Sequence, residues 1–429
     1  MSKFIEEDNN KDGIDRRGFL KCMAWTGTGV LWFMSGGTLK SLGLSQIIDS
    51  STGKMKNGLN LKKGDYSFIQ ISDSHIGFNK AANPDVVGTL QAAISKINAL
   101  EVHPSFIIHT GDLSHLSKPS EFDTLEQVLK GIRTDKIFYV PGEHDFLADN
   151  GSEYLKRFGK ETKGTGWYSF NAHGTHFIGL VNVANLKAGG LGDLGSEQLE
   201  WLEDDLRAVH SSTPVVVFAH IPLWNVYPKW GWGTDDSAQA LKYLKRFGSV
   251  TVLNGHIHQV MQKVEGNITF HTAMSTAFPQ PAPGEADSPG PMKVPAEKLR
   301  SMLGLASVNY IEHMHTLAVI DSPLMNGVMT MPEEEGRKEK ESAGAPGKNQ
   351  IIIKNYRFMP QKLTVKAGTK VTWINTDESP HLVLSDDKLF SSPPLDTNDK
   401  YSHLFDTPGD YKYFCKIHPM MVGEVVVKQ

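Results

Sequence analysis

The chain has 429 residues, more than one hydrophobic core ordinarily organises, so two domains with tails are expected. Its formal net charge of −4, from 44 basic and 48 acidic side chains, gives no electrostatic reason to expect a nucleic-acid partner. The two cysteines, Cys22 and Cys415, are too few for a disulfide framework.

The N-terminal segment has the pattern of an export signal. Arg16 and Arg17 precede an apolar, Gly-rich stretch over residues 22–37, and together they resemble a twin-arginine signal. The alternative is a chance Arg-Arg pair before a buried helix. We predict a signal or anchor over 1–45, a spacer over 46–63, and a periplasmic or otherwise exported protein. The apolar stretch is short for a membrane span. No clear cleavage site follows it, so an uncleaved signal would leave an N-terminal membrane anchor.

Strand-like and helix-like patterns alternate over residues 64–325, which predicts a layered α/β domain. The predicted strands are 67–71, 105–109, 136–140, 167–171, 175–183, 215–219, 250–254, 268–272 and 307–320. Helical spacing occurs over 85–100, 121–132 and 196–209, and the third helix opens with the capping pattern of Ser196. The Pro-rich segment 278–295 predicts a surface loop.

Metal-binding side chains directly follow five of these strands. The blocks are Asp73-Ser74-His75, Gly111-Asp112, Gly142-Glu143-His144-Asp145, His220 and Gly255-His256-Ile257-His258. Open α/β sheets build their sites at the carboxyl ends of their strands, so these groups are expected along one rim. Their number is sufficient for two cations.

The identity and spacing of the blocks resemble the calcineurin-like metallophosphoesterases over residues 65–321. The resemblance implies a four-layer α/β/β/α sandwich that hydrolyses phosphate mono- or diesters with two divalent ions of iron, manganese or zinc. It implies one ion bound by Asp73, His75, Asp112 and His258, and a second bound by Asp112 as a bridge, Glu143, His220 and His256. His144 would protonate the leaving oxygen or stabilise the transition state, and Asp145 would orient it.

Glu143 departs from the family pattern, which has Asn at this position. With Asp73 and Asp112 it makes three carboxylates, so two divalent ions would leave about one net positive charge instead of two. We expect tighter metal binding, a preference for harder ions such as manganese or iron, and weaker attraction of phosphate. An active variant is favoured because His144 and the other ligands remain; drift toward a binding role is the alternative.

Other conspicuous side chains receive no role from the pattern. The histidines of this kind are His109, His173, His176, His271, His313 and His315, although His271 is close enough to the expected rim to touch a substrate. Trp224, Trp230 and Trp232 could stack on a base or sugar, but packing is the favoured interpretation.

Residues 331–349 are charged and nearly free of large apolar side chains, which predicts a linker. Over residues 350–429 the pattern becomes all-β, with strands expected at 351–354, 363–366, 370–375, 381–385, 411–415 and 423–427. A segment of this length with short strands separated by turns is typical of a small β-sandwich.

His381, Cys415, His418 and Met421 supply two imidazoles, a thiolate and a thioether, the donor set of a blue-copper centre. The C-x-x-H-P-x-M string resembles the cupredoxins of the plastocyanin and pseudoazurin type, which implies a Greek-key sandwich. By that resemblance the histidines and Cys415 are equatorial copper ligands and Met421 is axial, with Met420 as the competing sulfur. A β-sandwich with incidental His, Cys and Met residues is the alternative.

The sequence as a whole predicts an exported phosphoesterase with an appended blue-copper domain that exchanges electrons with a periplasmic redox partner. The alternative hypothesis is a copper-dependent electron carrier or copper sensor in which the larger domain is a metal-bearing scaffold.

Overall fold

The computed structural model describes residues 30–35, 38–43, 66–100, 103–134, 136–311, 316–325 and 347–429. Arg16, Arg17, the spacer, His313, His315 and most of the predicted linker lie outside the described residues. Strands β1 (Val30–Ser35) and β2 (Thr38–Gly43) pair antiparallel within a separate N-terminal unit. Residues 61–327 and 336–429 together form one compact unit. Across the described ranges, no helix is both long and apolar enough to cross a membrane.

Two β-sheets form the centre of the larger domain. The six-stranded sheet has the order β10 (Gln262–Glu265), β11 (Ile268–Thr272), β9 (Val250–Asn254), β8 (Val215–Phe218), β7 (Thr175–Gly179), β6 (Tyr168–Ala172). The five-stranded sheet has the order β13 (Thr316–Pro323), β12 (Gly304–Ile311), β3 (Tyr66–Ile71), β4 (Ile107–His109), β5 (Ile137–Tyr139). Strands β3, β4 and β5 pair in parallel, as do β7, β8, β9 and β11.

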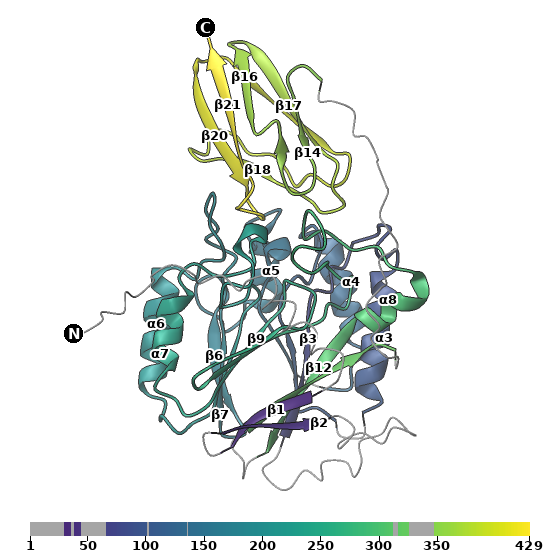
Figure 1. The fold of residues 1–429 in the computed structure, drawn as a ribbon, viewed down its shortest axis with the longest axis vertical. Coiled ribbons are helices and arrows are strands. Elements are labelled where there is room, and N and C mark those ends of the chain that lie inside the picture. Colours follow the sequence, from purple (N-terminus) through teal and green to yellow (C-terminus); the bar gives the residue numbers. More distant parts are fainter. Residues whose placement is uncertain are drawn as a thin grey trace, which may run out of the picture. The chain divides into compact units, whose positions relative to one another are not determined.

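Helices cover the outer faces of both sheets, which gives the predicted α/β/β/α sandwich (Figure 1). They are α3 (Val86–Asn98), α4 (Pro119–Leu129), α5 (Ser152–Phe158), α6 (Ser196–Arg207), α7 (Ser237–Leu244) and α8 (Ala296–Met302). Phe68 and Phe106 of one sheet pack against Phe177 and Val216 of the other and form the core between the sheets. Because central strands such as β3, β8 and β9 are buried at every position and are mostly apolar, each sheet can bury both of its faces.

Three local expectations need correction or completion. Residues 307–320, expected as one strand, are parts of the antiparallel hairpin of β12 and β13. Ser196 does not cap α6, because Gly195 occupies the N-cap position with a φ of 80° and no side-chain bond. Helices α5, α7 and α8 and strand β10 were not predicted, whereas the Pro-rich segment before α8 contains no helix or strand, as expected.

The C-terminal domain is the expected all-β sandwich. One sheet has the order β15 (Phe358–Met359), β14 (Gln350–Ile353), β17 (Thr369–Asn375), β19 (Lys400–Phe405). The other has the order β16 (Lys362–Lys366), β21 (Val422–Lys428), β20 (Gly409–Cys415), β18 (Val383–Ser385). Trp373 lies fully buried between the sheets, where it packs against Tyr413 and Phe405. Strands β15 and β19 were not predicted.

Candidate metal centres

The five metal-binding blocks follow the carboxyl ends of β3, β4, β5, β8 and β9, as the sequence predicts. Five candidate ligands on these turns have left-handed backbone conformations, with φ of 52° at Asp73, 40° at His75, 50° at Asp112, 70° at His256 and 53° at His258. Non-glycine residues rarely adopt this region, and such conformations concentrate at functional sites. The turns are held by backbone hydrogen bonds, for example from Asp73 N to Gly111 O at 3.0 Å.

The first group of candidate ligands contains Asp73, His75, Asp112 and His258, all of them buried. His258 Nε2 lies 3.3 Å from Asp73 Oδ1 and 3.2 Å from His75 Nε2. His258 Nδ1 donates to the carbonyl oxygen of Phe278 at 2.6 Å, which turns Nε2 toward the group. Such a backbone acceptor commonly fixes the tautomer and orientation of a metal-binding histidine.

The second group contains Glu143, His220 and His256, and Asp112 joins it to the first. His220 Nε2 and His256 Nδ1 each lie 3.0 Å from a carboxylate oxygen of Glu143. Asp112 Oδ2 is 3.4 Å from His75 Nε2 and 3.4 Å from His220 Nε2. Asp112 therefore stands in the predicted bridging position between the two groups.

The atoms of the second group fit a bound cation. His220 Nδ1 donates to Thr110 O at 2.7 Å, so in the neutral ring Nε2 carries a lone pair. That atom faces Glu143 Oε2 at 3.0 Å, and neither atom has a hydrogen bond of acceptable geometry to any described residue. Two acceptors this close need positive charge between them, which a second proton on the ring or a divalent ion supplies.

The pKa shifts around the rim indicate the same requirement for positive charge. Burial lowers the pKa of His220, but the carboxylates of Asp112 and Glu143 more than offset it and hold the value well above normal. Burial raises the pKa of Asp73, but His258 and His220 outweigh it and bring the value down to about 2. The Asp73 carboxylate is therefore ionised and available as a ligand.

His144 and Asp145 hold the third block in place. His144 Nδ1 donates to His115 O at 2.8 Å, and its backbone amide donates to Asp112 Oδ1 at 3.0 Å. Asp145 does not contact the His144 ring by a hydrogen bond. Its carboxylate accepts instead from the amides of Gly142, Leu113 and Ser114 and from the Ser114 hydroxyl, at 2.8–3.1 Å. Asp145 thus orients His144 through the backbone of the turn.

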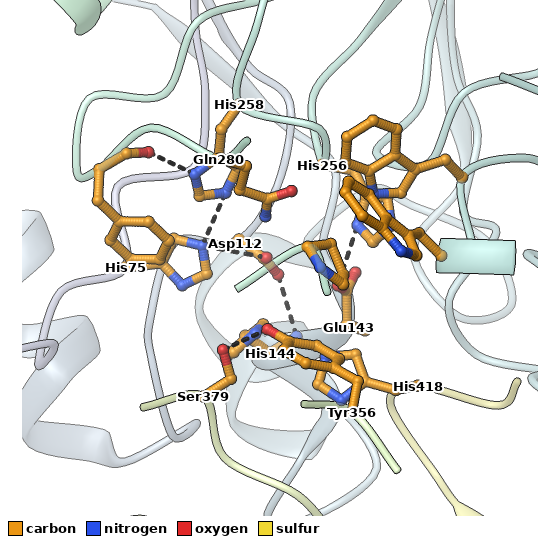
Figure 2. A pocket seen from close by; sticks show the side chains of 14 residues that line it. His75, Asp112, Glu143, His144, His256, His258, Gln280, Tyr356, Ser379 and His418 are labelled. Carbon is orange, nitrogen blue, oxygen red and sulfur yellow. Dashed lines mark hydrogen bonds and ion pairs between the residues drawn. The ribbon is translucent and has the colours of Figure 1, made fainter. Parts of the chain in front are cut away.

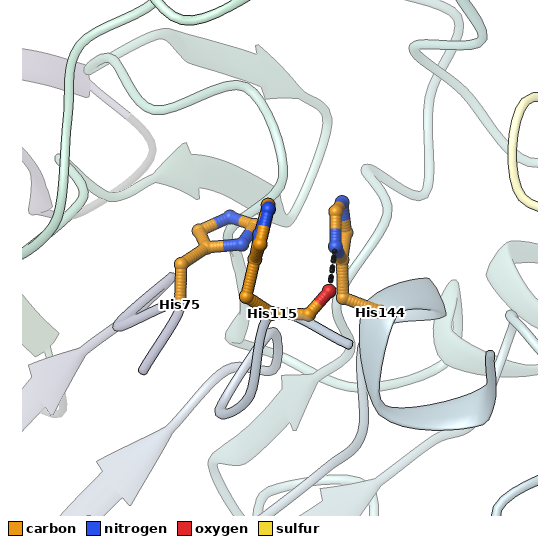
Figure 3. A group of neighbouring side chains, drawn as sticks. All are labelled: His75, His115 and His144. Atoms are coloured by element: carbon orange, nitrogen blue, oxygen red, sulfur yellow. Dashed lines mark hydrogen bonds between the residues drawn. The ribbon is translucent and has the colours of Figure 1, made fainter. Parts of the chain in front are cut away.

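His115 is a neighbour of the site that sequence reasoning missed (Figure 3). Its side chain is 1% exposed and its ring stacks on His144, with a centroid distance of 5.2 Å and an interplanar angle of 20°. The ring of His75 lies 5.6 Å away. Neither ring nitrogen of His115 has a hydrogen-bond partner among the described residues. Its position three residues after Asp112 was the available signal.

The predicted copper ligands converge in the C-terminal domain. Cys415 Sγ lies 3.6 Å from His381 Nδ1 and 3.7 Å from His418 Nδ1, and the two Nδ1 atoms are 3.2 Å apart. Met421 is buried in the same core cluster. His381 Nε2 donates to Asp377 at 2.9 Å, a contact that the sequence did not reveal. Three soft or borderline donors around one point suit copper.

The histidines without a predicted role have structural partners. His109 bonds to Ser74 at 2.8 Å, His176 pairs with Asp205 at 2.8 Å, and His271 pairs with Asp321 at 2.9 Å. His173 stacks on Tyr66. Among the tryptophans, Trp224 packs on Phe270, whereas Trp230 and Trp232 pack on each other and also line the pocket described next.

One pocket is lined both by candidate metal ligands and by side chains of the C-terminal domain (Figure 2). The larger domain contributes members of both metal groups together with His144 and the two tryptophans; the members are His75, Asp112, Glu143, His256 and His258. Tyr356, Ser379 and His418 of the C-terminal domain line the same pocket. Sequence reasoning predicted two separate sites and did not foresee this shared wall.

Residues 66–260 match the calcineurin-like phosphoesterase family, and residues 330–427 match the cupredoxin-like domain family. Amicyanin-alpha of Methylorubrum extorquens is 36% identical over 98 residues, which cover 22% of this chain and 82% of the relative. A 3',5'-cyclic-nucleotide phosphodiesterase of a Nostoc species is 23% identical, and the alignment covers 49% of this chain and 79% of the relative. A serine/threonine-protein phosphatase of Danio rerio is 28% identical, and the alignment covers 46% of this chain and 71% of the relative.

Proposed function

Because this chain joins a calcineurin-like metallophosphoesterase domain to an amicyanin-like cupredoxin domain, we propose that it is an exported phosphoester hydrolase with a blue-copper centre. The single observation that carries the hydrolase proposal is Asp112 Oδ2, 3.4 Å from an imidazole of each metal group. The named relatives include a phosphodiesterase and a phosphatase, so both mono- and diesters are candidate substrates.

The residues of the pocket have distinct roles in this proposal. Two bound divalent ions would neutralise phosphate oxygens and lower the pKa of a bound water. The chain itself holds His144 with Nδ1 tied to the His115 carbonyl, which leaves Nε2 without a backbone partner; in the imidazolium form this atom carries the proton that would pass to the leaving oxygen. Trp230 and Trp232 form an apolar side of the pocket and restrict the entry of water.

The test uses the full chain, loaded separately with manganese, iron or zinc, on a panel of phosphomonoesters and phosphodiesters. We expect Asp112→Asn to abolish turnover because both groups lose their common ligand. His144→Ala should slow esters with poor leaving groups by about 10²–10⁴-fold but affect nitrophenyl esters less, because nitrophenolate needs no proton. Absence of turnover for every ester with all three metals would refute the hydrolase proposal.

The second candidate is a copper protein whose phosphoesterase-like domain is a scaffold, and Glu143 is the observation that favours it. Its buried carboxylate adds negative charge where a phosphate anion would bind. If the wild type is inert and Glu143→Asn is active, binding rather than catalysis is the native role of this domain.

Two further parts of the proposal concern copper and export. Intense visible absorption on addition of copper(II) would support the copper centre and its electron-transfer role with a periplasmic partner. Export is proposed on Arg16 and Arg17. Replacement of both by Lys should leave the protein inside the cell in a fractionation assay; unchanged export would refute the twin-arginine route.

A further inference from the structure

The copper-binding end of the cupredoxin domain packs against the phosphoesterase domain through several kinds of contact. Lys80 pairs with Asp396 at 3.2 Å, and Lys293 pairs with Glu378 at 3.4 Å. The amide of Gly189 donates to the carbonyl oxygen of Pro419 at 2.6 Å. Apolar packing accompanies them, because Leu116 and Leu147 of the phosphoesterase domain belong to the same buried cluster as the cupredoxin core.

Met420 and Gly231 show how closely the two surfaces fit. A Cβ on Gly231 would lie 2.7 Å from Met420 Cε, closer than real Cβ atoms come to their neighbours. Met420, the sulfur that competes with Met421 in the sequence, is therefore a packing residue against the phosphoesterase domain. Gly231 has a φ of 79°, a conformation that also favours glycine there.

Within the pocket, the copper ligand His418 faces the candidate proton donor His144, with ring centroids 6.5 Å apart at an angle of 71°. Tyr356 links this wall to the rest of the copper site. Its ring lies 4.6 Å from that of His418 and 5.2 Å from that of His381, and its hydroxyl hydrogen-bonds to Ser379. A displacement of the Tyr356 ring would therefore displace both copper-binding imidazoles.

The free space among these side chains is small. The cavity is about 20 Å³, which is room for about one water molecule. A phosphate group at the metal groups would therefore lie close to the lining side chains, which include Tyr356 and Ser379 of the cupredoxin domain.

We propose that the cupredoxin domain forms a wall of the phosphoesterase pocket, and that Tyr356 and Ser379 contact the bound phosphate compound and transmit its presence to the copper ligands. The occupant is a small phosphoester or free phosphate. The two sites are then one functional unit, in which the copper centre responds to occupation of the hydrolytic site. The proposal rests on the proposed function only in that phosphate must bind at the metal groups.

The experiment titrates inorganic phosphate into the full chain, loaded with copper(II) and with the divalent ion that supports turnover. Calorimetry measures phosphate binding, while the visible absorption band and electron paramagnetic resonance of copper report its ligand field. We expect the copper signals to shift with the same dissociation constant as the calorimetric binding. Tyr356→Phe, which loses the hydroxyl, should at least halve the shift while copper remains bound.

Charge reversal tests whether the shift needs the docked wall. Lys80→Glu with Lys293→Glu should abolish the shift, and adding Asp396→Lys with Glu378→Lys should restore it by re-forming both ion pairs in reverse. Glu424→Lys is the matched control, because it reverses a charge in an ion pair with Lys362 inside the cupredoxin domain. It should leave the shift unchanged.

The outcomes separate the two proposals. Phosphate that binds by calorimetry without any change in the copper signals would overturn this inference and leave the proposed hydrolase function standing. A shift that survives the double charge reversal would overturn the assigned docking contacts as its route. Failure of phosphate to bind to a chain that hydrolyses esters would overturn this inference alone, because the hydrolase proposal is judged by turnover.

Discussion

Glu143 allows the electrostatics of the site to be tested by matched substitutions. Its side chain is only 3% exposed, and its two oxygens each lie 3.0 Å from an imidazole nitrogen, of His220 and His256. Glu143→Gln removes the charge and keeps the length, Glu143→Asp keeps the charge and shortens the side chain, and Glu143→Asn does both. The set therefore separates charge from reach.

The expected change in phosphate affinity follows from the net charge of the site. Two divalent ions with three carboxylates leave about one net positive charge, and Gln or Asn raises this to about two. At about 5 Å and an effective dielectric constant of about 20, one unit charge contributes about 3 kcal/mol to the interaction with a phosphate charge. This corresponds to roughly 100-fold in affinity. We expect Gln to tighten phosphate binding by up to that factor and to weaken binding of the second metal by at least as much.

The assay measures the phosphate inhibition constant of the full chain by turnover and the metal dissociation constants by calorimetry. Glu143→Asp should stay within a few-fold of wild type for phosphate, because its charge is unchanged. If Gln and Asp alter phosphate inhibition equally, or if Gln leaves both constants within twofold, the charge argument is wrong and side-chain length controls the site.

Three further predictions concern other parts of the chain. Cys415→Ser should abolish the visible copper band while circular dichroism stays unchanged, because Ser fits the same buried position; a retained band would exclude Cys415 as a ligand. Glu121→Gln should lower the free energy of unfolding by about 1–3 kcal/mol in urea titration. The reason is that the buried Glu121 carboxylate accepts hydrogen bonds from three amides of the turn that carries His115. Replacement of the exposed Glu203 by Gln is the control. Burial raises the pKa of Asp205, but hydrogen bonds from His176 and Ser169 outweigh this effect and hold the pKa below its normal value. The ionised Asp205 therefore stabilises the folded protein above the pKa of the unfolded state, and this stabilisation is lost as the pH falls through the pKa of the folded state. Asp205→Asn should therefore be less stable than wild type at pH 7, with the difference shrinking below about pH 4; a difference constant with pH would contradict this.

That the candidate ligands lie together could be predicted from sequence, because each block follows a strand and the carboxyl ends of parallel strands meet at one rim. Local pattern also identified Cys415 and His418, which share one short loop. Tyr356 and Ser379 could not be found in this way, because their role depends on docking between domains and no local pattern records it. His115 was missed because the family motif does not include it, although its ring contacts the rings of His75 and His144.

Smaller errors have local physical causes. Ser196 has the right residue type for a cap, but Gly195 adopts the N-cap conformation one residue earlier, so Ser196 is already inside α6. Residues 307–320 give the pattern of one strand because apolar side chains continue through both β12 and β13. Strand β19 has only one fully buried side chain, that of Phe405, and so gives a weak alternating signal.

The left-handed turns at the rim also have a consequence for how metal enters. Each such conformation at a non-glycine residue costs on the order of 1–3 kcal/mol, and the surrounding fold imposes it at five candidate ligands. The ligand geometry therefore exists before an ion arrives, so the speed of loading depends on ligand exchange at the ion and not on ordering of the chain. Amide hydrogen exchange at Asp73, whose amide donates to Gly111 O, should accordingly be slow in the metal-free protein and change little when metal is added.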